Sequence, residues 1–215
     1  MDSAVFFIDD DPSFRRALVR LLNAHGYKTK AYASASEFMK EKLPDSPACL
    51  ILDLKMPDIN GLDIQDALAQ RGDHLPVIFL SGQGDVTTSV QAMKGGAVDF
   101  LTKPIDEDKL VSVVRVALER SARLRDERDA LKKDVDAFDS LTRREREVCV
   151  RIAQGMLNKQ VGFELGTSEK TVKAQRAHVM QKLGASSLAD VVRLVERLHA
   201  SGHVQALRIS TNSSA

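Results

Sequence analysis

The stretch that decides the fold is LILDLKMPDINGLD, residues 50–63, in which an apolar run ends on an acid. Residues 50–52 are typical of a strand that is buried on both faces. The pairs MP (56–57) and NG (60–61) contain residues that favour tight turns. We therefore predict that Asp53 ends a buried strand and that the turns behind it lead the chain away, which keeps its carboxylate open to the rim of the sheet.

Short segments that favour strands recur through the first half of the chain, and each is too short for a helix. Helical patterns with their own start signals separate them. Pro12 suits a first helical position, and Gly26 and Gly95 suit the position just beyond a helix end. Alternation at this spacing predicts a doubly wound, five-stranded parallel sheet with helices on both faces. The strands are expected at 4–8, 28–32, 48–52, 77–81 and 98–102, and the helices at 13–26, 62–71, 86–96 and 107–118.

Polar residues follow the ends of the predicted strands, where ligands bind in sheets of this kind. Acids end the first and third strands, and a serine and a lysine follow at the fourth and fifth. Carboxylates gathered at one rim repel one another unless a cation joins them, so Asp9, Asp10 and Asp53 suggest Mg²⁺, which prefers hard oxygen ligands. Plainer interpretations exist, with Asp11 as a helix cap and Lys103 as an ordinary surface residue.

The chemistry that fits this set is phosphoryl transfer. With a metal bound, Asp53 is a candidate nucleophile toward phosphorus, which would give an aspartyl phosphate. Such a reaction asks the protein mainly for positioning and compensation of charge. Lys103 would neutralise one side of the phosphoryl group, and Ser81 would donate a hydrogen bond to it. Gly82 would leave room for the phosphate to approach.

The first 120 residues resemble the receiver domain of bacterial two-component response regulators, which has a flavodoxin-like fold. The resemblance is carried by DD at 9–10, DLKMPDINGLD at 53–63, SG at 81–82 and DFLTKP at 99–104. It implies that Asp53 accepts a phosphoryl group from a partner sensor histidine kinase. It also implies roles for other residues: magnesium binding by Asp9, Asp10, Asp53 and the main-chain carbonyl of Lys55; phosphate contact and switching by Ser81, Gly82, Lys103 and Phe100; and control of the phosphoryl lifetime by Lys55 and Gln83.

Beyond Leu110, apolar residues continue on a three-four rhythm through dense mixed charge as far as Phe138. This pattern predicts that one helix runs on from the receiver through residues 119–139. A weak two-stranded coiled coil would give such a pattern. A solvated spacer helix without a partner would give it as well.

A new helix is predicted to begin in LTRREREV (141–148), where Thr142 and Glu145 form a capping box, and to end at Gly155. In NKQVGFELGTSEKTVKAQRAHVMQKLG (158–184), a short helix is expected to close at Gly166 and a longer one to begin at Ser168. Two helices about a short turn are a helix-turn-helix candidate. Similar units also occur in helical bundles that bind no DNA.

Residues 141–198 resemble the LuxR-type DNA-binding domain in LTRREREV, Gly155, NKQV, LGTSEKTVKAQR and QKLGASS. With the receiver, the chain up to residue 200 resembles a response regulator of the FixJ/NarL class. The resemblance implies base contacts in the major groove by Lys173, Ala174 and Ala177, and phosphate contacts by Lys159, Lys170, Thr171 and Arg176. Gln175 departs from the usual histidine, which puts backbone anchoring or base preference in doubt.

The two ends of the chain carry opposite net charge. Residues 1–118 contain 13 Lys and Arg against 17 Asp and Glu, whereas residues 140–215 contain 12 against 6. This favours a polyanion partner for the second half, although two ordinary solvated surfaces would give the same counts. No apolar stretch approaches the roughly 20 residues of a membrane span, and the N-terminus is acidic, so we expect a cytoplasmic protein without a membrane partner. Cys49 and Cys149 are expected to be buried thiols.

For the whole chain we predict a receiver domain at 1–118, a helical linker at 119–139, a LuxR-type helix-turn-helix domain at 140–200 and a disordered tail at 201–215. We expect a transcription regulator in which phosphorylation of Asp53 produces a homodimer and relieves inhibition of DNA binding, with RNA polymerase as a further candidate partner. We do not expect an enzyme, beyond slow self-phosphorylation and dephosphorylation at Asp53.

Two alternatives differ in class. The first is a DNA-binding adaptor that works without phosphorylation, and the complete set of acids, serine and lysine argues against it. The second is an aspartyl-phosphate phosphotransferase, which would want a second acid or base close to Asp53. The motif DLKMP, residues 53–57, offers none at that spacing.

Overall fold

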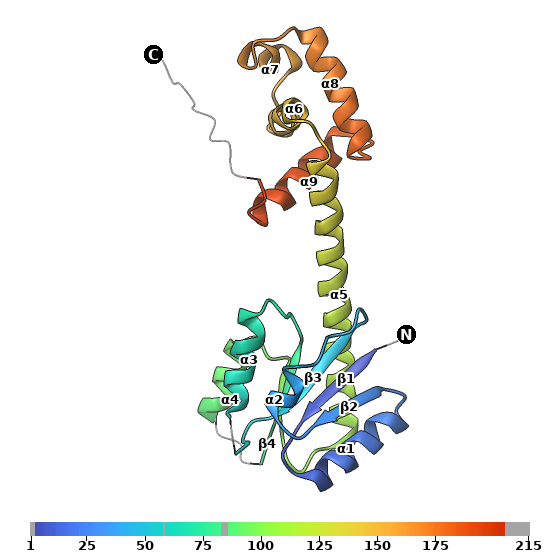
Figure 1. The fold of residues 1–215 in the computed structure, drawn as a ribbon, viewed down its shortest axis with the longest axis vertical. Helices are drawn as coiled ribbons and strands as arrows, with labels where there is room; N and C mark the ends of the chain where they lie inside the picture. The colour runs from blue at the N-terminus through green and yellow to red at the C-terminus, as the bar shows by residue number, and fades with distance from the viewer. Residues whose placement is uncertain (1–2, 58, 83–85, 205–215) are drawn as a thin grey trace. The chain divides into compact units, whose positions relative to one another are not determined.

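The computed structural model describes residues 3–57, 59–82 and 86–204, which fall into two compact units. The first unit is Met1–Asp126 and the second is Glu127–Ala215. Figure 1 shows a sheet flanked by helices in the first unit and only helices in the second. Each unit has a hydrophobic core of its own. The predicted division into an α/β part followed by an all-α part is confirmed.

The first unit is built on a five-stranded parallel sheet in the order β2-β1-β3-β4-β5. All five predicted strands are present. The central strand β3 ends on Asp53, as predicted for this acid, and every one of its residues is buried. The fifth strand starts at Asp99 and not at Val98. The strands are β1 Ala4–Ile8, β2 Lys28–Tyr32, β3 Ala48–Asp53, β4 Val77–Ser81 and β5 Asp99–Thr102.

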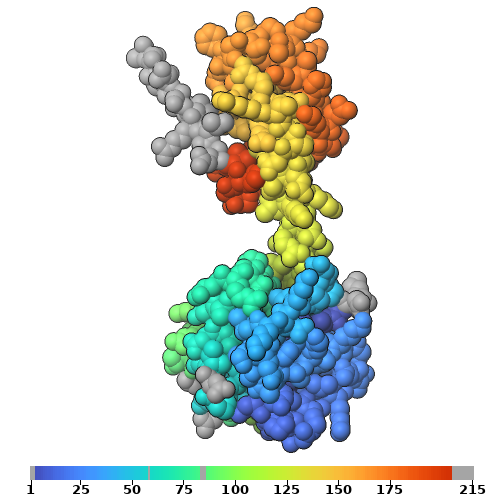
Figure 2. Space-filling view, in the orientation of Figure 1, coloured from blue at the N-terminus to red at the C-terminus, as the bar shows by residue number. Residues whose placement is uncertain are grey.

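Helices cover both faces of the sheet, as predicted. One face packs against α2, α3 and α4, and the other packs against α1 and the first part of α5. The space-filling view shows the blue to teal segments of the first unit packed closely against one another (Figure 2). The short helix α2 was not predicted, because a single turn is too short to display a helical period. The helices are α1 Pro12–Ala24, α2 Ala35–Phe38, α3 Gly61–Gln70, α4 Val86–Lys94 and α5 Glu107–Asp139.

The helix α5 belongs to both units. Its apolar residues up to Ala117 are buried against the sheet, whereas Leu131, Val135 and Phe138 pack into the core of the second unit. Residues 126–130 between these parts are all exposed. The two cores bury Ala117 and Phe138 of the apolar rhythm, whereas Leu131 and Val135 are only partly buried, so a weak coiled coil along the linker stays a prediction.

Polar contacts between the first unit and α5 continue beyond Ala117. The backbone N–H of Ala48, at the start of β3, donates to Ser121 Oγ at 3.0 Å. The Arg125 guanidinium donates to the carbonyl of Pro44 at 3.3 Å and also to that of Asp45. Ser121 is buried. The first unit thus includes α5 at least as far as Arg125.

The second unit is a bundle of four short helices that pack on the end of α5. The capping box of Thr142 and Glu145 is present at the start of α6, and Ser168 caps α8 as predicted. Gly155 and Gly166 follow α6 and α7 with φ of 83° and 62°, a region that glycine adopts readily. The last helix, α9, was not predicted as an element. The helices are α6 Arg143–Ala153, α7 Asn158–Glu164, α8 Glu169–Lys182 and α9 Leu188–Ala200.

The first residues of the predicted tail are packed. The His203 ring lies edge-on to Phe138 with ring centroids 6.3 Å apart, and Val204 packs on the core of the second unit. The prediction of disorder from Ser201 is therefore wrong for these four residues, because apolar contact with α5 stabilises them. Residues 205–215 lie outside the described part of the chain. Within the described part, no helix has the length and apolar character that crossing a membrane requires.

Candidate functional site

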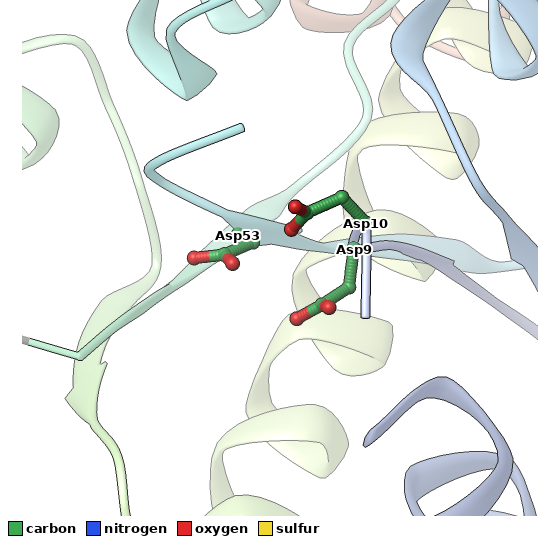
Figure 3. Close-up of side chains that lie close together, drawn as sticks. All are labelled: Asp9, Asp10 and Asp53. Atoms are coloured by element: carbon green, nitrogen blue, oxygen red, sulfur yellow. The ribbon is translucent and has the colours of Figure 1, made fainter. Parts of the chain in front are cut away.

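Three aspartates lie together where β1 and β3 end (Figure 3). One carboxylate oxygen from each of Asp9, Asp10 and Asp53 lies within 4.8 Å of the other two. Asp9 is fully buried and Asp53 is 7% exposed, whereas Asp10 is open to solvent. The predicted gathering of acids at the rim of the sheet is confirmed.

Lys103, which follows β5, bridges two of these acids. Its Nζ donates to Asp9 Oδ2 at 2.8 Å and to Asp53 Oδ2 at 3.1 Å. The lysine side chain is 23% exposed. The interpretation of Lys103 as an ordinary surface lysine is therefore wrong.

The backbone orients both bridged carboxylates. The N–H of Asp11 donates to Asp9 Oδ1 at 2.8 Å, and the N–H of Lys55 lies 3.4 Å from Asp53 Oδ1. In each aspartate, one oxygen thus faces the main chain and the other faces Lys103. Asp11 itself caps α1 by accepting from the N–H groups of Ser13 and Phe14, so its plainer interpretation as a helix cap is confirmed.

The electrostatics of the site follow from burial and the Lys103 bridge. Burial raises the pKa of Asp9, and the hydrogen bond from Lys103 opposes that rise. Burial by itself would lower the pKa of Lys103, but the hydrogen bonds that its ammonium donates to Asp9 and Asp53 outweigh this effect and raise it. The ammonium therefore stays protonated at neutral pH.

The turn after Asp53 is held by close backbone packing. Lys55 and Asn60 form an isolated antiparallel bridge, and the Asn60 side chain caps α3 by accepting from the Leu62 N–H at 3.1 Å. A Cβ at Gly61 would lie 2.9 Å from the carbonyl oxygen of Asp53 and 3.0 Å from the Phe79 ring. Only glycine lets the chain pass this close to the end of β3.

The other residues predicted for the receiver site fall around the same rim. Ser81 ends β4 and is buried, and its carbonyl accepts from the N–H of Lys103 at 2.7 Å. A Cβ at Gly82 would meet open space. Phe100 of β5 is half-buried against the core on the α2–α4 face. Gln83 lies outside the described residues.

Sequence reasoning missed two residues at this site. Phe14 of α1 presents its ring face to Lys103, with Nζ 4.2 Å from the ring centroid. The Arg15 guanidinium donates to the carbonyl of Asp9 at 2.5 Å. The sequence carries no spacing signal for either, because both belong to an ordinary amphipathic helix and reach the site only through the packing of α1 on the sheet.

The acid cluster fits a divalent metal. Three close carboxylates face one ammonium, which leaves an excess of negative charge at the rim. The donor atoms are all hard oxygens, which are the ligands that Mg²⁺ prefers.

A second candidate site lies on α8. Helical spacing puts Lys170, Lys173, Ala174 and Ala177 on one exposed face, opposite the buried Val172 and Val179 of the core. Lys159 is exposed near the start of α7. The exposed face of α8 thus carries cationic and small side chains, as do helices that contact bases in the major groove of DNA.

Two residues predicted to contact DNA from α8 are engaged within the unit, and Gln175 lies between elements of the same unit. The Thr171 hydroxyl lies 2.8 Å from Ser168 Oγ of the helix cap. Arg176 is half-buried, with Nη1 3.5 Å from Asn158 Oδ1 of α7. Gln175 is half-buried and its Oε1 is enclosed without a hydrogen-bond donor. Gln175 therefore lies at the flank of the exposed face and not on it.

Comparison with known families agrees with both sites. Residues 5–115 match the model of the response regulator receiver domain, and residues 139–195 match the model of the luxR family of bacterial regulatory proteins. The chain belongs to the two-component response regulators that join a receiver domain to a LuxR-type DNA-binding domain. The resemblance to the FixJ/NarL class is confirmed.

Individual relatives cover nearly the whole chain. Nodulation protein W of Bradyrhizobium diazoefficiens is 43% identical over 194 residues, which is 90% of this chain and 86% of that protein. The transcriptional regulatory protein FixJ of Azorhizobium caulinodans is 39% identical over 190 residues, covering 88% of this chain and 90% of that one. Among solved structures, the response regulator StyR superposes with a TM-score of 0.80 at 38% identity, covering 92% of this chain and 100% of that one.

Proposed function

We propose that this protein is a transcriptional response regulator whose DNA binding is switched by phosphorylation of Asp53. The observation that carries the proposal is the Lys103 ammonium held between Asp9 and Asp53, because phosphoryl transfer requires a cation fixed beside the carboxylate that attacks phosphorus. The phosphoryl donor would be the phosphohistidine of a sensor histidine kinase.

Mg²⁺ is part of the proposal. Asp9, Asp10, Asp53 and the main-chain carbonyl of Lys55 would hold it, and the close spacing of the three carboxylates supports this set. When bound, Mg²⁺ neutralises negative charge on the carboxylates and on phosphoryl oxygens.

Each of the chain's own residues at the site has a separate role in the proposed phosphoryl transfer. An Asp53 carboxylate oxygen attacks phosphorus, so that an O–P bond forms while the N–P bond of the donor histidine breaks. Lys103 compensates charge on the phosphoryl oxygens, and the Ser81 hydroxyl donates a hydrogen bond to one of them. The open space at Gly82 admits the group.

Phosphorylation would then act as a switch. Ser81 and Lys103 are drawn toward the new group, Phe100 follows into the vacated space, and the surface of α4 and β5 becomes a homodimer face. Exposed apolar residues on α4, Val86 and Val90, support that face. A shift of the equilibrium from 1:99 to 99:1 needs about 5.5 kcal/mol of differential stabilisation.

The output is binding to double-stranded DNA by the second unit. The exposed face of α8 supports base contacts by Lys173, Ala174 and Ala177. Phosphate contacts would come from Lys159, Lys170, Thr171 and Arg176, with salt dependence as the consequence. RNA polymerase is a further candidate partner. Because the DNA target lies in the cytoplasm, the protein is proposed to act there.

The protein would turn over only its own phosphoryl group and is not proposed as an enzyme. Hydrolysis of the aspartyl phosphate ends the signal. Lys55, which is exposed and lies two residues beyond Asp53, and Gln83 are proposed to set this lifetime by flanking the path of water.

The test compares wild type with Asp53→Asn, with and without beryllofluoride, by gel filtration and DNA binding. We expect beryllofluoride with Mg²⁺ to dimerise the wild type and raise its DNA affinity, and to leave Asp53→Asn unchanged. Equal, tight DNA binding by both proteins without beryllofluoride would instead identify a phosphorylation-independent adaptor. Repeated release of phosphate from small phosphoesters would identify a phosphotransferase or phosphatase.

A further inference from the structure

The ring of Phe14 faces the ammonium group of Lys103. The Nζ lies 4.2 Å from the ring centroid, inside the range of about 6 Å over which a cation is attracted to the face of an aromatic ring. The same Nζ donates to Asp9 and Asp53. The ammonium is therefore held by two carboxylates and one ring.

Phe14 does not depend on Lys103 for its own position. It lies in the first turn of α1, where its N–H is 3.3 Å from the capping carboxylate of Asp11. Its ring packs against Phe7 of β1 with centroids 5.9 Å apart and planes at 70°. Phe7 is fully buried in the sheet. The ring is thus anchored to the same sheet that carries the aspartates.

Lys103 needs such an anchor. A lysine has a long, flexible stem and a strongly hydrated head, which favours an extended position in water. When Asp53 carries a phosphoryl group, one carboxylate oxygen becomes esterified, and the ammonium has to exchange that partner for a phosphoryl oxygen. The Phe14 ring can hold the ammonium at the site during this exchange, because the ring is not altered by it.

We propose that Phe14 is a positioning residue for Lys103 and sets how readily Asp53 accepts a phosphoryl group. The proposal rests on the proposed function of Asp53. A leucine at position 14 fills part of the same volume but has no ring face to attract a cation. A tyrosine keeps the ring.

The contact itself is tested by NMR on the full-length protein. A methylene group close to a ring face resonates upfield, so the ε-protons of Lys103, assigned with Lys103→Met, should be shifted upfield in the wild type. We expect Phe14→Tyr to keep this shift and Phe14→Leu to lose it. An unchanged lysine resonance in Phe14→Leu would overturn the contact.

The role is tested by the rate at which acetyl phosphate with Mg²⁺ labels Asp53 below saturation. The matched control is Phe38→Leu, which removes a buried ring that packs 5.6 Å from Phe6 in the core on the α2–α4 face. We expect labelling of Phe14→Leu to be about three- to tenfold slower, the loss that a partly buried cation–π contact implies. Phe14→Tyr and Phe38→Leu should stay within about twofold of the wild type.

The outcomes separate this proposal from the function on which it rests. Equal labelling of Phe14→Leu and wild type would overturn the positioning role and leave Asp53 as phosphoacceptor. Equal slowing in Phe14→Leu and Phe38→Leu would also overturn it, because a loss of packing would then explain both. Failure of the wild type to label would overturn the phosphoacceptor function and this role with it.

Discussion

Lys182→Met is expected to destabilise the second unit at neutral pH. Glu145 Oε2 of α6 accepts from Lys182 Nζ of α8 at 2.7 Å and from the backbone N–H of Thr142 at 2.8 Å. The Glu145 side chain is only 8% exposed, whereas that of Lys182 is 37% exposed. Without the lysine, this nearly buried carboxylate keeps the Thr142 N–H and a more distant partner, the His178 ring, whose Nδ1 lies 3.7 Å from Oε1. The loss of the charged partner is costly at such a site.

The size of the effect follows from the pKa of Glu145. The Lys182 hydrogen bond first, and the Thr142 backbone second, lower this pKa from 4.5 to about 2. A pKa difference of one corresponds to about 1.4 kcal/mol, so the whole lowering corresponds to about 3 kcal/mol. Thr142 keeps its share in the variant and solvent screens the exposed lysine, so we expect a loss of about 1 to 1.5 kcal/mol.

The loss should depend on pH. Because the pKa of Glu145 is lower in the folded protein than in the unfolded chain, the ionised side chain stabilises the fold fully above pH 4.5. That contribution disappears as the pH falls from 4.5 toward about 2. Wild type and Lys182→Met should therefore differ at pH 7 and approach each other in acid.

The chain contains its own probes for the assay. Cys149 is fully buried in the second unit and Cys49 in the first, so labelling by dithiodipyridine at increasing urea reports each unit separately. Lys173→Met, at an exposed lysine of the same helix, is the matched control. If Cys149 were protected from labelling equally in Lys182→Met and in the wild type at pH 7, Lys182 would not stabilise the second unit. If the variant lost as much stability in acid as at pH 7, the stabilisation would not depend on ionised Glu145.

Three further outcomes are expected. Gly61→Ala should cost about 1 to 3 kcal/mol in thermal unfolding, because its Cβ would meet the Asp53 carbonyl at 2.9 Å, and an unchanged melting temperature would contradict the close approach. Lys170→Ala should weaken DNA binding to all sequences and reduce the slope of log affinity against log salt by about one in anisotropy titrations, and an unchanged slope would exclude a phosphate contact. Lys173→Ala should reduce the difference in binding free energy between operators that differ at one base pair by about 1 to 3 kcal/mol. The operators are obtained by in vitro selection, and an equal loss of affinity for all of them would contradict base reading.

The sheet and the acid cluster could be predicted from the sequence because each depends on local pattern. Apolar runs fix the buried strands, and parallel strands bring their carboxyl ends to one edge, so Asp9, Asp53 and Lys103 had to meet once the fold was given. The same logic found the capping box at Thr142, whose partner lies three residues away.

What the sequence did not reveal depends on packing between distant elements. Phe14 reaches Lys103 only through the seating of α1 on the sheet, and Lys182 reaches Glu145 only through the crossing of α6 and α8. The apolar rhythm of α5 has the same spacing whether it faces a partner helix or two intrachain cores, so periodicity alone was ambiguous.

The contacts between the first unit and α5 determine where the chain can be divided into fragments. A fragment that stops at residue 118 would lose Ser121, leaving the N–H of Ala48 at the head of β3 without its acceptor, and would lose the Arg125 clamp on the carbonyl of Pro44. Ending after Asp126, inside the exposed turn, keeps both contacts. A division of the chain into its two units should therefore leave α5 up to Asp126 with the first unit.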